Sequence, residues 1–464
     1  MANVIPEVTF NEGVKEFLGQ SFCNEKAVSA VGEEKCQEKL SDILRSLSYP
    51  PSYTVLRINT LHHSKQDVFH QLTQVLVQQY KSRERLPPTV DYHASLDDTL
   101  VISSPTGHSK RHEVCPEANK EVIVDRQCGL AVLRGADVYA PGIMAATQDI
   151  IKGDKVSVFV DIDSQCRKGF IHRFKGNKAF IGNGCAAMSR KDLFVGNSSP
   201  RGMGVHMTEP IFDCPSLNGV LVDRLFLQNL PSIVVSHVLN PQPGRRLLDM
   251  CAAPGGKTTH LATLMKDQGV VIALDKSPSK INKIKQNARR MGLNCIQTFV
   301  YDSTKACCMQ SSCNSDAPPF SPESFDYILL DAPCSGLGQR PQIANQLQLS
   351  EVKSYPAYQR QFFSTAVKLL RPGGYLVYST CTITLGENEE IVSWALKDYP
   401  QLQLCQQVPH LGGIGLLGTM LQPDQLCKLQ RFHGVSPMIS CANGHSDNDT
   451  IGFFVAKFVK QFPS

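Results

Sequence analysis

The second half of the chain alternates short apolar segments with amphipathic ones, and this alternation constrains the fold more than any other feature. After residue 212 we expect strands and helices in turn, with strands at 245–250, 270–275, 325–331 and 452–459 and helices that include 355–370 and 387–397. Chains of this pattern build parallel strands joined by crossover helices. The sequence therefore predicts an α/β fold with a doubly wound, mostly parallel sheet, whose ligands bind outside the carboxyl ends of the strands.

The 464 residues are too many for one ordinary domain, and their patterns divide them into three regions. Residues 1–118 are predicted to form helices and short strands, with a strand at 53–61, a helix at 65–82 and a polar linker around 104–120. Residues 119–211 are predicted to form a β-rich unit with strands in VIVD, KVSVFVDI, RKGFIHRF and KAFIGNG. Residues 212–464 carry the strand–helix alternation.

Net charge is only +5, but one strip of the middle region is strongly basic. Between Ser164 and Lys191 there is no Asp or Glu, three phenylalanines are interleaved, and the cations are Arg167, Lys168, Arg173, Lys175, Lys178, Arg190 and Lys191. Cations mixed with aromatic rings favour a polyanionic partner whose bases stack. A solvated strand face over core phenylalanines is an equally good interpretation of the strip taken alone.

Several classes of protein are disfavoured by what the sequence lacks. The start has no basic region followed by a long apolar run, and no apolar stretch reaches the ~18 residues of a membrane span. We therefore expect no membrane association and an intracellular location; the cytoplasm is our assignment, although the sequence does not separate it from the nucleus. Cys307, Cys308 and Cys313 lack paired spacing and a nearby histidine, so no metal is expected. A monomer is expected because no coiled coil or long apolar edge stands out.

The segment DMCAAPGGKT, from Asp249 to Thr258, follows a predicted strand and opens a predicted helix. Its small residues let the backbone turn tightly and approach a ligand closely. It is not a phosphate-binding P-loop, because Cys251 stands where that motif needs a glycine, and it lacks the G-x-G-x-x-G fingerprint of dinucleotide-binding folds. The segment predicts a ligand loop of another kind.

Four carboxylates end successive predicted strands, namely Asp249, Asp275, Asp302 and Asp331. Asp275 stands where a carboxylate commonly receives the hydroxyls of a ribose. One such residue is more often a helix N-cap than a ligand contact. We expect all four to point at the same crevice, and four in register favour a cofactor that contains a nucleoside.

Two cysteines follow the next strands, Cys334 in DAPCSG and Cys381 in VYSTCTI. A lone cysteine is usually a small buried hydrophobe, but two on loops at the ligand edge suit nucleophilic catalysis. Carbon 5 of cytosine is too weak a nucleophile to take a methyl group until a thiolate adds to carbon 6. Spacing alone does not decide which cysteine is that nucleophile.

DMCAAPGGKT, ILLDAPCSG and VYSTCT, in this order, resemble the cofactor and catalytic motifs of the Sun-domain family of RNA cytosine-5 methyltransferases. VLRINTL, NPQPGRRLLD, QRFHG and GFFVAKF extend the resemblance over most of the chain. The middle unit, with AVLRGADVYAPGI, IIKGDKV and IGNG, resembles a PUA domain, an RNA-binding β-barrel. An inserted PUA domain points to the sixth branch of this family, which modifies tRNA.

The resemblance implies a class I S-adenosylmethionine-dependent methyltransferase fold with an inserted PUA barrel and an N-terminal α/β extension. It implies that the loop holds the methionine part of S-adenosyl-L-methionine through Cys251, Ala252, Ala253, Pro254, Gly255, Gly256 and Lys257. Asp275 would hold the ribose, Asp302 would lie near the adenine, and Asp331 would bind both cofactor and cytosine. Cys381 would be the covalent nucleophile and Cys334 would assist product release. Lys257 would contact the catalytic loop, although a lysine at a helix start can also lie in solvent.

For that branch the implied substrate is the tRNA acceptor end, with the PUA domain gripping the terminal CCA and presenting the cytosine at position 72. The candidate RNA contacts are Arg134, Tyr139, Arg167 and Lys168, each of which could also be an ordinary surface residue. Messenger RNA is an undecided second partner. An acidic contact expected before the last strand would be Asp447, Asp449 or neither.

Two other functions compete with RNA methylation. A PUA-type RNA-binding protein with an inert methyltransferase portion is disfavoured, because both cysteines, Asp331 and the glycine loop are present. A methyltransferase acting on protein or a small molecule is disfavoured by the basic strip and has no obvious use for a second cysteine.

Overall fold

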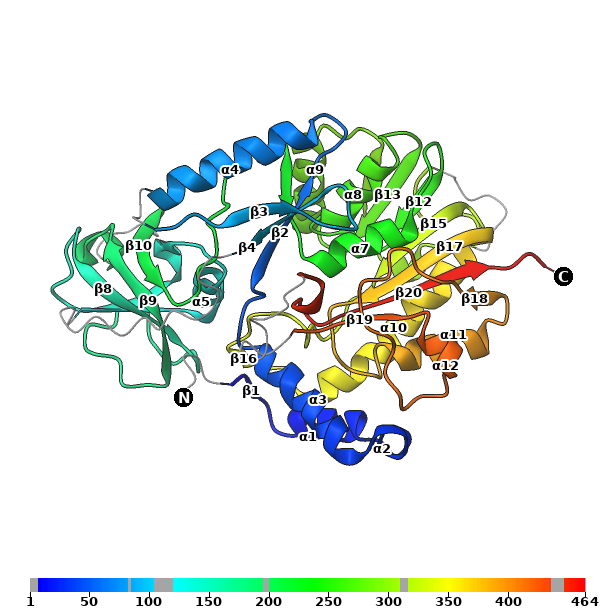
Figure 1. Ribbon diagram of the computed structural model, residues 1–464, viewed down its shortest axis with the longest axis horizontal. Coiled ribbons are helices and arrows are strands. Elements are labelled where there is room, and N and C mark those ends of the chain that lie inside the picture. The colour runs from blue at the N-terminus through cyan, green and yellow to red at the C-terminus, as the bar shows by residue number, and fades with distance from the viewer. Residues whose placement is uncertain are drawn as a thin grey trace.

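The computed structural model describes residues 7–81, 85–103, 120–194, 200–308, 316–434 and 446–463 (Figure 1). The linker expected around 104–120 lies outside these residues except for its last position, and so does Cys313. Within the described residues, no helix is both long and apolar enough to cross a membrane.

A large sheet with the strand order β14-β13-β12-β15-β17-β20-β18 forms the body of the molecule, and β19 pairs with β20 at its margin. The first five strands are parallel, and β20 runs antiparallel to β17. The predicted doubly wound, mostly parallel sheet is therefore confirmed. The strands are β12 (Arg246–Asp249), β13 (Val270–Asp275), β14 (Ile296–Val300), β15 (Phe325–Asp331), β17 (Leu370–Thr380), β18 (Leu402–Leu404), β19 (Gln430–Phe432) and β20 (Phe453–Lys460).

Helices cover both faces of this sheet because successive apolar residues of each strand point to opposite sides. Leu248 and Leu330 pack with Phe363 of α10 and Ile391 of α11, whereas their neighbours Leu247 and Leu329 pack against α7 and α8. The helices are α7 (Leu230–Leu239), α8 (Gly256–Leu264), α9 (Pro278–Arg290), α10 (Leu349–Leu369), α11 (Glu389–Asp398) and α12 (Pro423–Leu426), with 3-10 turns at Ser303–Lys305 and Ser446–Asn448.

The middle unit is a six-stranded sheet with the order β6-β10-β9-β8-β5-β7, which lies at one end of the molecule (left in Figure 1). Its elements are β5 (Glu121–Val124), α5 (Arg126–Leu133), β6 (Val138–Tyr139), the 3-10 turn Ala140–Gly142, β7 (Ile143–Ala146), β8 (Lys155–Asp161), β9 (Lys178–Ala186), α6 (Arg190–Phe194) and β10 (Met203–Pro210). Gly129 lets α5 lie against β8, since a Cβ there would be 2.5 Å from a Val160 methyl.

The strand predicted in RKGFIHRF, at residues 167–174, is wrong. Only Phe170 makes an isolated bridge, to Ala145. Arg190 explains the difference, because its guanidinium donates to the carbonyls of Gly169 and Phe170 that a strand would offer to a neighbouring strand. The alternation of aromatic and basic residues resembles that of a strand. Here, however, the Arg190 side chain, and not a neighbouring strand, hydrogen-bonds to the backbone carbonyls.

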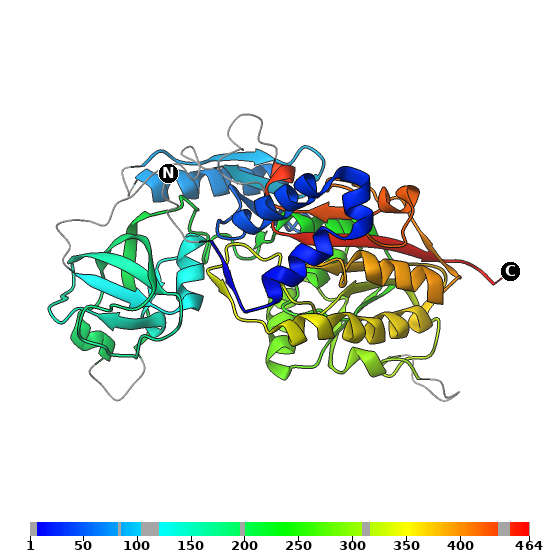
Figure 2. The same cartoon turned by 90° about the horizontal axis from the view of Figure 1, so that it is seen from below.

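The described part of the N-terminal region contributes four helices and most of a four-stranded sheet with the order β11-β2-β4-β3. Strand β11 follows the middle unit in sequence. The chain therefore leaves this sheet at β4, forms the middle unit and returns to the sheet at β11. The first three of these helices lie together against the catalytic body beside α10 (Figure 2). The elements are β1 (Thr9–Phe10, paired with β16, Ala344–Asn345), α1 (Val14–Phe22), α2 (Glu25–Val31), α3 (Glu33–Ser46), β2 (Tyr53–Ile58), α4 (Lys65–Lys81), β3 (Thr89–Tyr92), β4 (Thr99–Ser103) and β11 (Leu225–Leu227).

A buried carboxylate fastens the N-terminal sheet to the catalytic body. Asp98, just before β4, accepts hydrogen bonds from Nε2 of His237 on α7 at 2.9 Å and from Nε2 of His260 on α8 at 2.7 Å. Burial by itself would raise the pKa of Asp98, but the two imidazoles hold it well below its usual range. Burial lowers the pKa of His260 to about 3, so this ring is neutral at pH 7.

We predict that Asp98→Ala lowers the free energy of unfolding by about 3 kcal/mol, because the buried imidazole of His260 and the partly buried imidazole of His237 lose their acceptor. Urea denaturation measures this loss. Asp97→Ala is the matched control, since the neighbouring carboxylate is 99% exposed, and we expect it to stay within about 0.5 kcal/mol of the unchanged protein. Equal stability of the two variants would contradict the role of Asp98.

Candidate active site

The segment between β12 and α8 forms a cradle at the carboxyl edge of the sheet. Gly255 has a φ of +103°, and a Cβ on it would meet the backbone of Ile284 on α9 at 3.2 Å. Asn287 of α9 donates to the carbonyl of Pro254 at 2.8 Å. The loop is therefore pinned against α9 and leaves its other side open.

A cavity of about 350 Å³ opens beside this loop. Its lining includes Asp331 and six of the seven loop residues expected to hold the methionine part of the cofactor, namely Cys251, Ala252, Ala253, Pro254, Gly256 and Lys257. Because most of these loop residues have small side chains, the backbone of the loop can contact an extended ligand with a charged end directly. The residues present fit the methionine part of S-adenosylmethionine.

The four strand-end carboxylates have different surroundings. Asp249 and Asp331 line the cavity beside the loop, whereas Asp275 and Asp302 are not among its lining residues, so the expectation that all four point at one crevice is corrected. Asp249 is buried and accepts a hydrogen bond from Thr258 Oγ1 at 2.8 Å. Burial raises the pKa of Asp249 to about 7. Its carboxylate supports the start of α8 from inside, because its nearest donor belongs to that helix.

Asp275 and Asp302 are only partly buried, and each also caps the turn that follows it. Asp275 accepts from the Ser277 backbone at 2.8 Å, and Asp302 accepts from Thr304 and lies 3.3 Å from Lys276 Nζ. Burial alone would raise the pKa of Asp302, but the bonds from Thr304 and Lys276 lower it. Both carboxylates remain at the sheet edge beyond the cradle, where ribose and base would lie.

Asp331 joins the cofactor loop to the strands that carry the cysteines. Its Oδ2 lies 2.7 Å from Lys257 Nζ, and its Oδ1 accepts from Ser379 Oγ at 2.7 Å. The Lys257 side chain is only 13% exposed. The solvent-exposed interpretation of Lys257 is therefore wrong, because its ammonium is paired inside the site.

The two cysteines meet at the edge of adjacent strands. Cys334 follows β15 and Cys381 follows β17, which pair in parallel. Their sulfur atoms are 3.3 Å apart. Residues distant in sequence thus form one cluster, as expected for loops that leave neighbouring parallel strands on the same side.

The surroundings make Cys381 the more acidic thiol. A hydrogen bond from Cys334 lowers the pKa of Cys381, with burial opposing and Gln339 and Lys257 assisting. The same bond to Cys381, together with burial, raises the pKa of Cys334 well above its usual range. Of the two thiols, Cys381 therefore ionises more readily, and Cys334 holds its proton more firmly.

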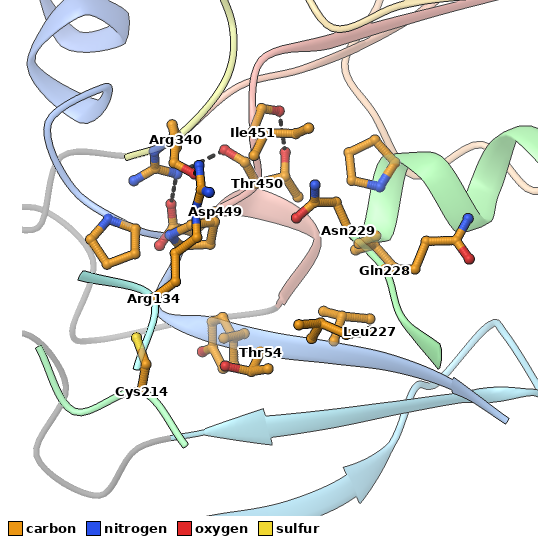
Figure 3. Close-up of a pocket in the computed structure, with 16 residues that line it drawn as sticks. Thr54, Arg134, Cys214, Leu227, Gln228, Asn229, Arg340, Asp449, Thr450 and Ile451 are labelled. Atoms are coloured by element: carbon orange, nitrogen blue, oxygen red, sulfur yellow. Dashed lines mark hydrogen bonds and ion pairs between the residues drawn. The ribbon is translucent and has the colours of Figure 1, made fainter. Parts of the chain in front are cut away.

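Arg340, which the sequence analysis missed, anchors the far side of the site. It is 3% exposed and donates to the Thr450 carbonyl at 2.7 Å, to the Ser46 carbonyl at 2.8 Å and to Asp449 (Figure 3). Of the two acids before the last strand, Asp449 therefore contacts Arg340, whereas Asp447 Oδ1 lies 2.7 Å from His93 Nε2. No sequence signal marked Arg340, because its partners come from distant parts of the chain.

A second cavity, of about 120 Å³, lies beside Arg340 where the three regions meet (Figure 3). It shares Arg134, Leu227, Gln228, Asn229 and Arg340 with the lining of the cofactor cavity, so the two adjoin. Arg134 reaches it from the middle unit and donates to the Arg340 carbonyl at 3.4 Å. The middle unit therefore borders the site through Arg134.

The other RNA-contact candidates lie on the surface of the middle unit. Tyr139 is 49% exposed, and Arg167 and Lys168 are also exposed. Part of the basic strip is engaged within the protein, since Arg173 and Lys178 both pair with Glu121. Arg190 is also engaged with the backbone. Arg167 and Lys168 both lie exposed, and Lys168 Nζ donates to the Pro141 carbonyl at 3.4 Å.

The chain is similar to known proteins along its whole length. It matches the family described as 16S rRNA methyltransferase RsmB/F over residues 236–459 and the PUA domain over residues 120–194. It is 47% identical to the Homo sapiens tRNA (cytosine(72)-C(5))-methyltransferase NSUN6, over 99% of each chain. It is 49% identical to the Mus musculus protein of the same name, over 98% of this chain and 97% of that one.

A solved structure supports the same relationship. The crystal structure of NSun6 from Pyrococcus horikoshii with SFG, an S-adenosylmethionine analogue, aligns with a TM-score of 0.71 and 28% identity, covering 96% of this chain and 100% of that chain. The predicted class I methyltransferase fold with an inserted PUA domain is confirmed. The chain therefore belongs to the NSUN6 branch of the Sun-domain RNA cytosine-5 methyltransferases, enzymes that use S-adenosylmethionine.

Proposed function

We propose that this protein methylates carbon 5 of the cytosine at position 72 of tRNA through a covalent bond between Cys381 and carbon 6. The observation that carries this proposal is the cysteine pair at 3.3 Å beside Asp331, which in turn holds Lys257 of the cofactor loop. The Homo sapiens and Mus musculus relatives carry tRNA cytosine-72 methyltransferase names.

Binding of the cofactor is assigned to the residues at the sheet edge. The cradle from Cys251 to Lys257 holds the methionine part, Asp275 the ribose hydroxyls and Asp302 the side nearest the adenine. When bound, S-adenosylmethionine supplies an electrophilic methyl group. Asp331 has one oxygen on Lys257 and the other on Ser379, which fixes the carboxylate at the border between cofactor and cytosine.

The two cysteines take successive roles. Cys381 attacks carbon 6 as a thiolate, which turns carbon 5 into an enamine-like nucleophile. Once its sulfur has bonded to carbon, Cys381 is no longer charged, and the main cause that holds the proton on Cys334 is removed. After carbon 5 has taken the methyl group, Cys334 releases its own proton to solvent, and its thiolate accepts the proton from carbon 5. The pair of electrons left behind restores the double bond between carbons 5 and 6 and expels Cys381 as a thiolate.

The target cytosine must leave its base pair to reach this edge, at a cost of a few kcal/mol. We assign anchoring of the CCA end to the PUA unit through Arg134, Tyr139, Arg167 and Lys168, which offsets this cost. Functionally, residues 1–118 form an RNA-recognition extension, 119–211 the PUA domain and 212–464 the catalytic domain. Strand β11 lies within the last range but completes the N-terminal sheet, so it ties the extension to the catalytic domain.

We further assign the protein to the cytoplasm as a monomer. Messenger RNA is a second candidate substrate, because nothing in the cysteine and carboxylate chemistry is particular to tRNA.

An acceptor-stem RNA with 5-fluorocytosine at position 72 tests the covalent step. We predict an adduct that survives denaturation, because fluorine at carbon 5 blocks the final loss of a proton. Cys381→Ala should abolish this adduct, and Cys334→Ala should accumulate adduct even on ordinary RNA. An adduct that persists in Cys381→Ala and vanishes in Cys334→Ala would reverse the two assignments.

The acidity of the thiols can be measured without RNA. We predict that iodoacetamide modifies Cys381 with a pH midpoint below the usual thiol value of about 8.5. Cys334→Ala should raise this midpoint, because it removes the hydrogen bond that stabilises the thiolate. Peptide mass spectrometry reads the modified fraction. An unchanged midpoint in Cys334→Ala, or faster modification of Cys334 in the unaltered protein, would contradict this assignment of charge.

Reversing both charges at Arg167 and Lys168 to Glu should weaken RNA binding more at low salt than at high salt. Each lost phosphate contact reduces the salt slope of the binding constant by about 1. Fluorescence anisotropy over a salt series measures it, with the exposed Lys397→Glu on α11 as the control. A loss that is equal at all salt concentrations would argue against phosphate contacts.

A further inference from the structure

A buried glutamate binds the loops of both cysteines at once. Glu387, between β17 and α11, is 1% exposed. Among the described residues its carboxylate accepts five hydrogen bonds, from Ser335 N at 2.9 Å, Ser335 Oγ at 2.6 Å, Gln359 Nε2 at 3.0 Å, Thr382 Oγ1 at 3.2 Å and Thr384 Oγ1 at 2.9 Å. A buried carboxylate is tolerated only with such a set of donors.

The donors are the immediate neighbours of the reacting sulfurs. Ser335 follows Cys334 and Thr382 follows Cys381, and their hydroxyls are also 2.7 Å from each other. Gln359 of α10 donates both to Glu387 and, at 3.0 Å, to the carbonyl of Pro333. Glu387 therefore binds both loops one residue beyond each cysteine, and Gln359 of α10 adds a further hydrogen bond to its carboxylate.

We propose that Glu387 is a positioning residue that sets the separation of the two cysteine sulfurs for methyl transfer, a role that rests on the proposed two-cysteine function. None of the residues that donate to its carboxylate lines the cofactor cavity. Glu387 acts through Ser335 and Thr382, because these two residues determine where the neighbouring cysteines point.

The path of the backbone depends on other contacts. Tyr378 Oη donates to the backbone carbonyl of Glu387 at 2.7 Å. Asn388 Nδ2 donates to the carbonyl of Thr382 at 3.0 Å and its Oδ1 accepts from Thr380. Because these bonds do not use the Glu387 carboxylate, a change confined to that carboxylate leaves the loop attached to the sheet and alters mainly the register of the cysteines.

The charge of Glu387 also bears on the thiols. It contributes, after Cys381 and burial, to raising the pKa of Cys334. The other groups that face the pair are Asp331 at the end of β15, Lys257 on α8, Gln339 in the following loop, Tyr355 on α10 and Tyr378 on β17. Removing the negative charge of Glu387 therefore lets Cys334 compete better with Cys381 for ionisation.

The test is Glu387→Gln, which keeps the shape but replaces one acceptor oxygen by a donor. With 5-fluorocytosine RNA we expect adduct formation about 100-fold slower than in the unaltered protein, the effect of a misplacement of about 1 Å. Dissociation constants for RNA and S-adenosylmethionine should stay within about twofold, because neither ligand touches this side chain. The pH at which the adduct rate is half-maximal should also shift. Glu390→Gln, on the exposed side of the same segment, is the control and should behave like the unaltered protein.

Two milder variants keep the test decisive if Glu387→Gln does not fold. Ser335→Ala and Thr382→Val each remove a single donor, and each should slow the adduct by about tenfold. Glu387→Asp, which keeps the charge, should be faster than Glu387→Gln. The inference is overturned if these variants form the adduct at the normal rate, or if their adduct rate falls only in proportion to RNA binding. If the unaltered protein forms no adduct at all, the proposed function fails instead.

Discussion

Asp331 accepts one hydrogen bond from each side of the site. The donors are Lys257 of the cofactor loop and Ser379 of the neighbouring strand, each at 2.7 Å. This carboxylate couples the place where a methyl donor is held to the place where the sulfurs lie. Parallel strands make the coupling possible, because β12, β15 and β17 end at the same edge. If these strands did not end at the same edge, Lys257, Asp331 and Cys381, which are far apart in sequence, would not lie in one site.

The two cysteines differ in acidity, because their shared hydrogen bond lowers the pKa of Cys381 and raises the pKa of Cys334. A hydrogen bond from Cys334 favours the Cys381 thiolate, and Lys257 acts in the same direction. Burial and Asp331 act in the opposite direction and raise the pKa of Cys381. Glu387 lies behind both loops and limits how far the sulfurs can separate, while Arg340 and Arg134 close the opposite side toward the PUA unit.

Features that depend on local pattern could be predicted from the sequence. The apolar run at 325–331 predicted β15 with its bounds, and strand periodicity placed Asp331, Cys334 and Cys381 at one edge. Features that depend on distant partners could not. Arg340 bonds to Ser46, which lies 294 residues earlier, and Glu387 has donors from three separate segments. The strand expected at 167–174 failed for the same reason, because Arg190 takes its carbonyls.

A crystal structure of Cys334→Ala bound to S-adenosylmethionine and an acceptor-stem RNA would test the central claim most directly. The account predicts continuous electron density between Cys381 Sγ and carbon 6 of the target cytosine, with Asp331 against the edge of the ring. A cytosine seated in the cavity with Cys381 buried away from it and bonded to nothing would contradict the account.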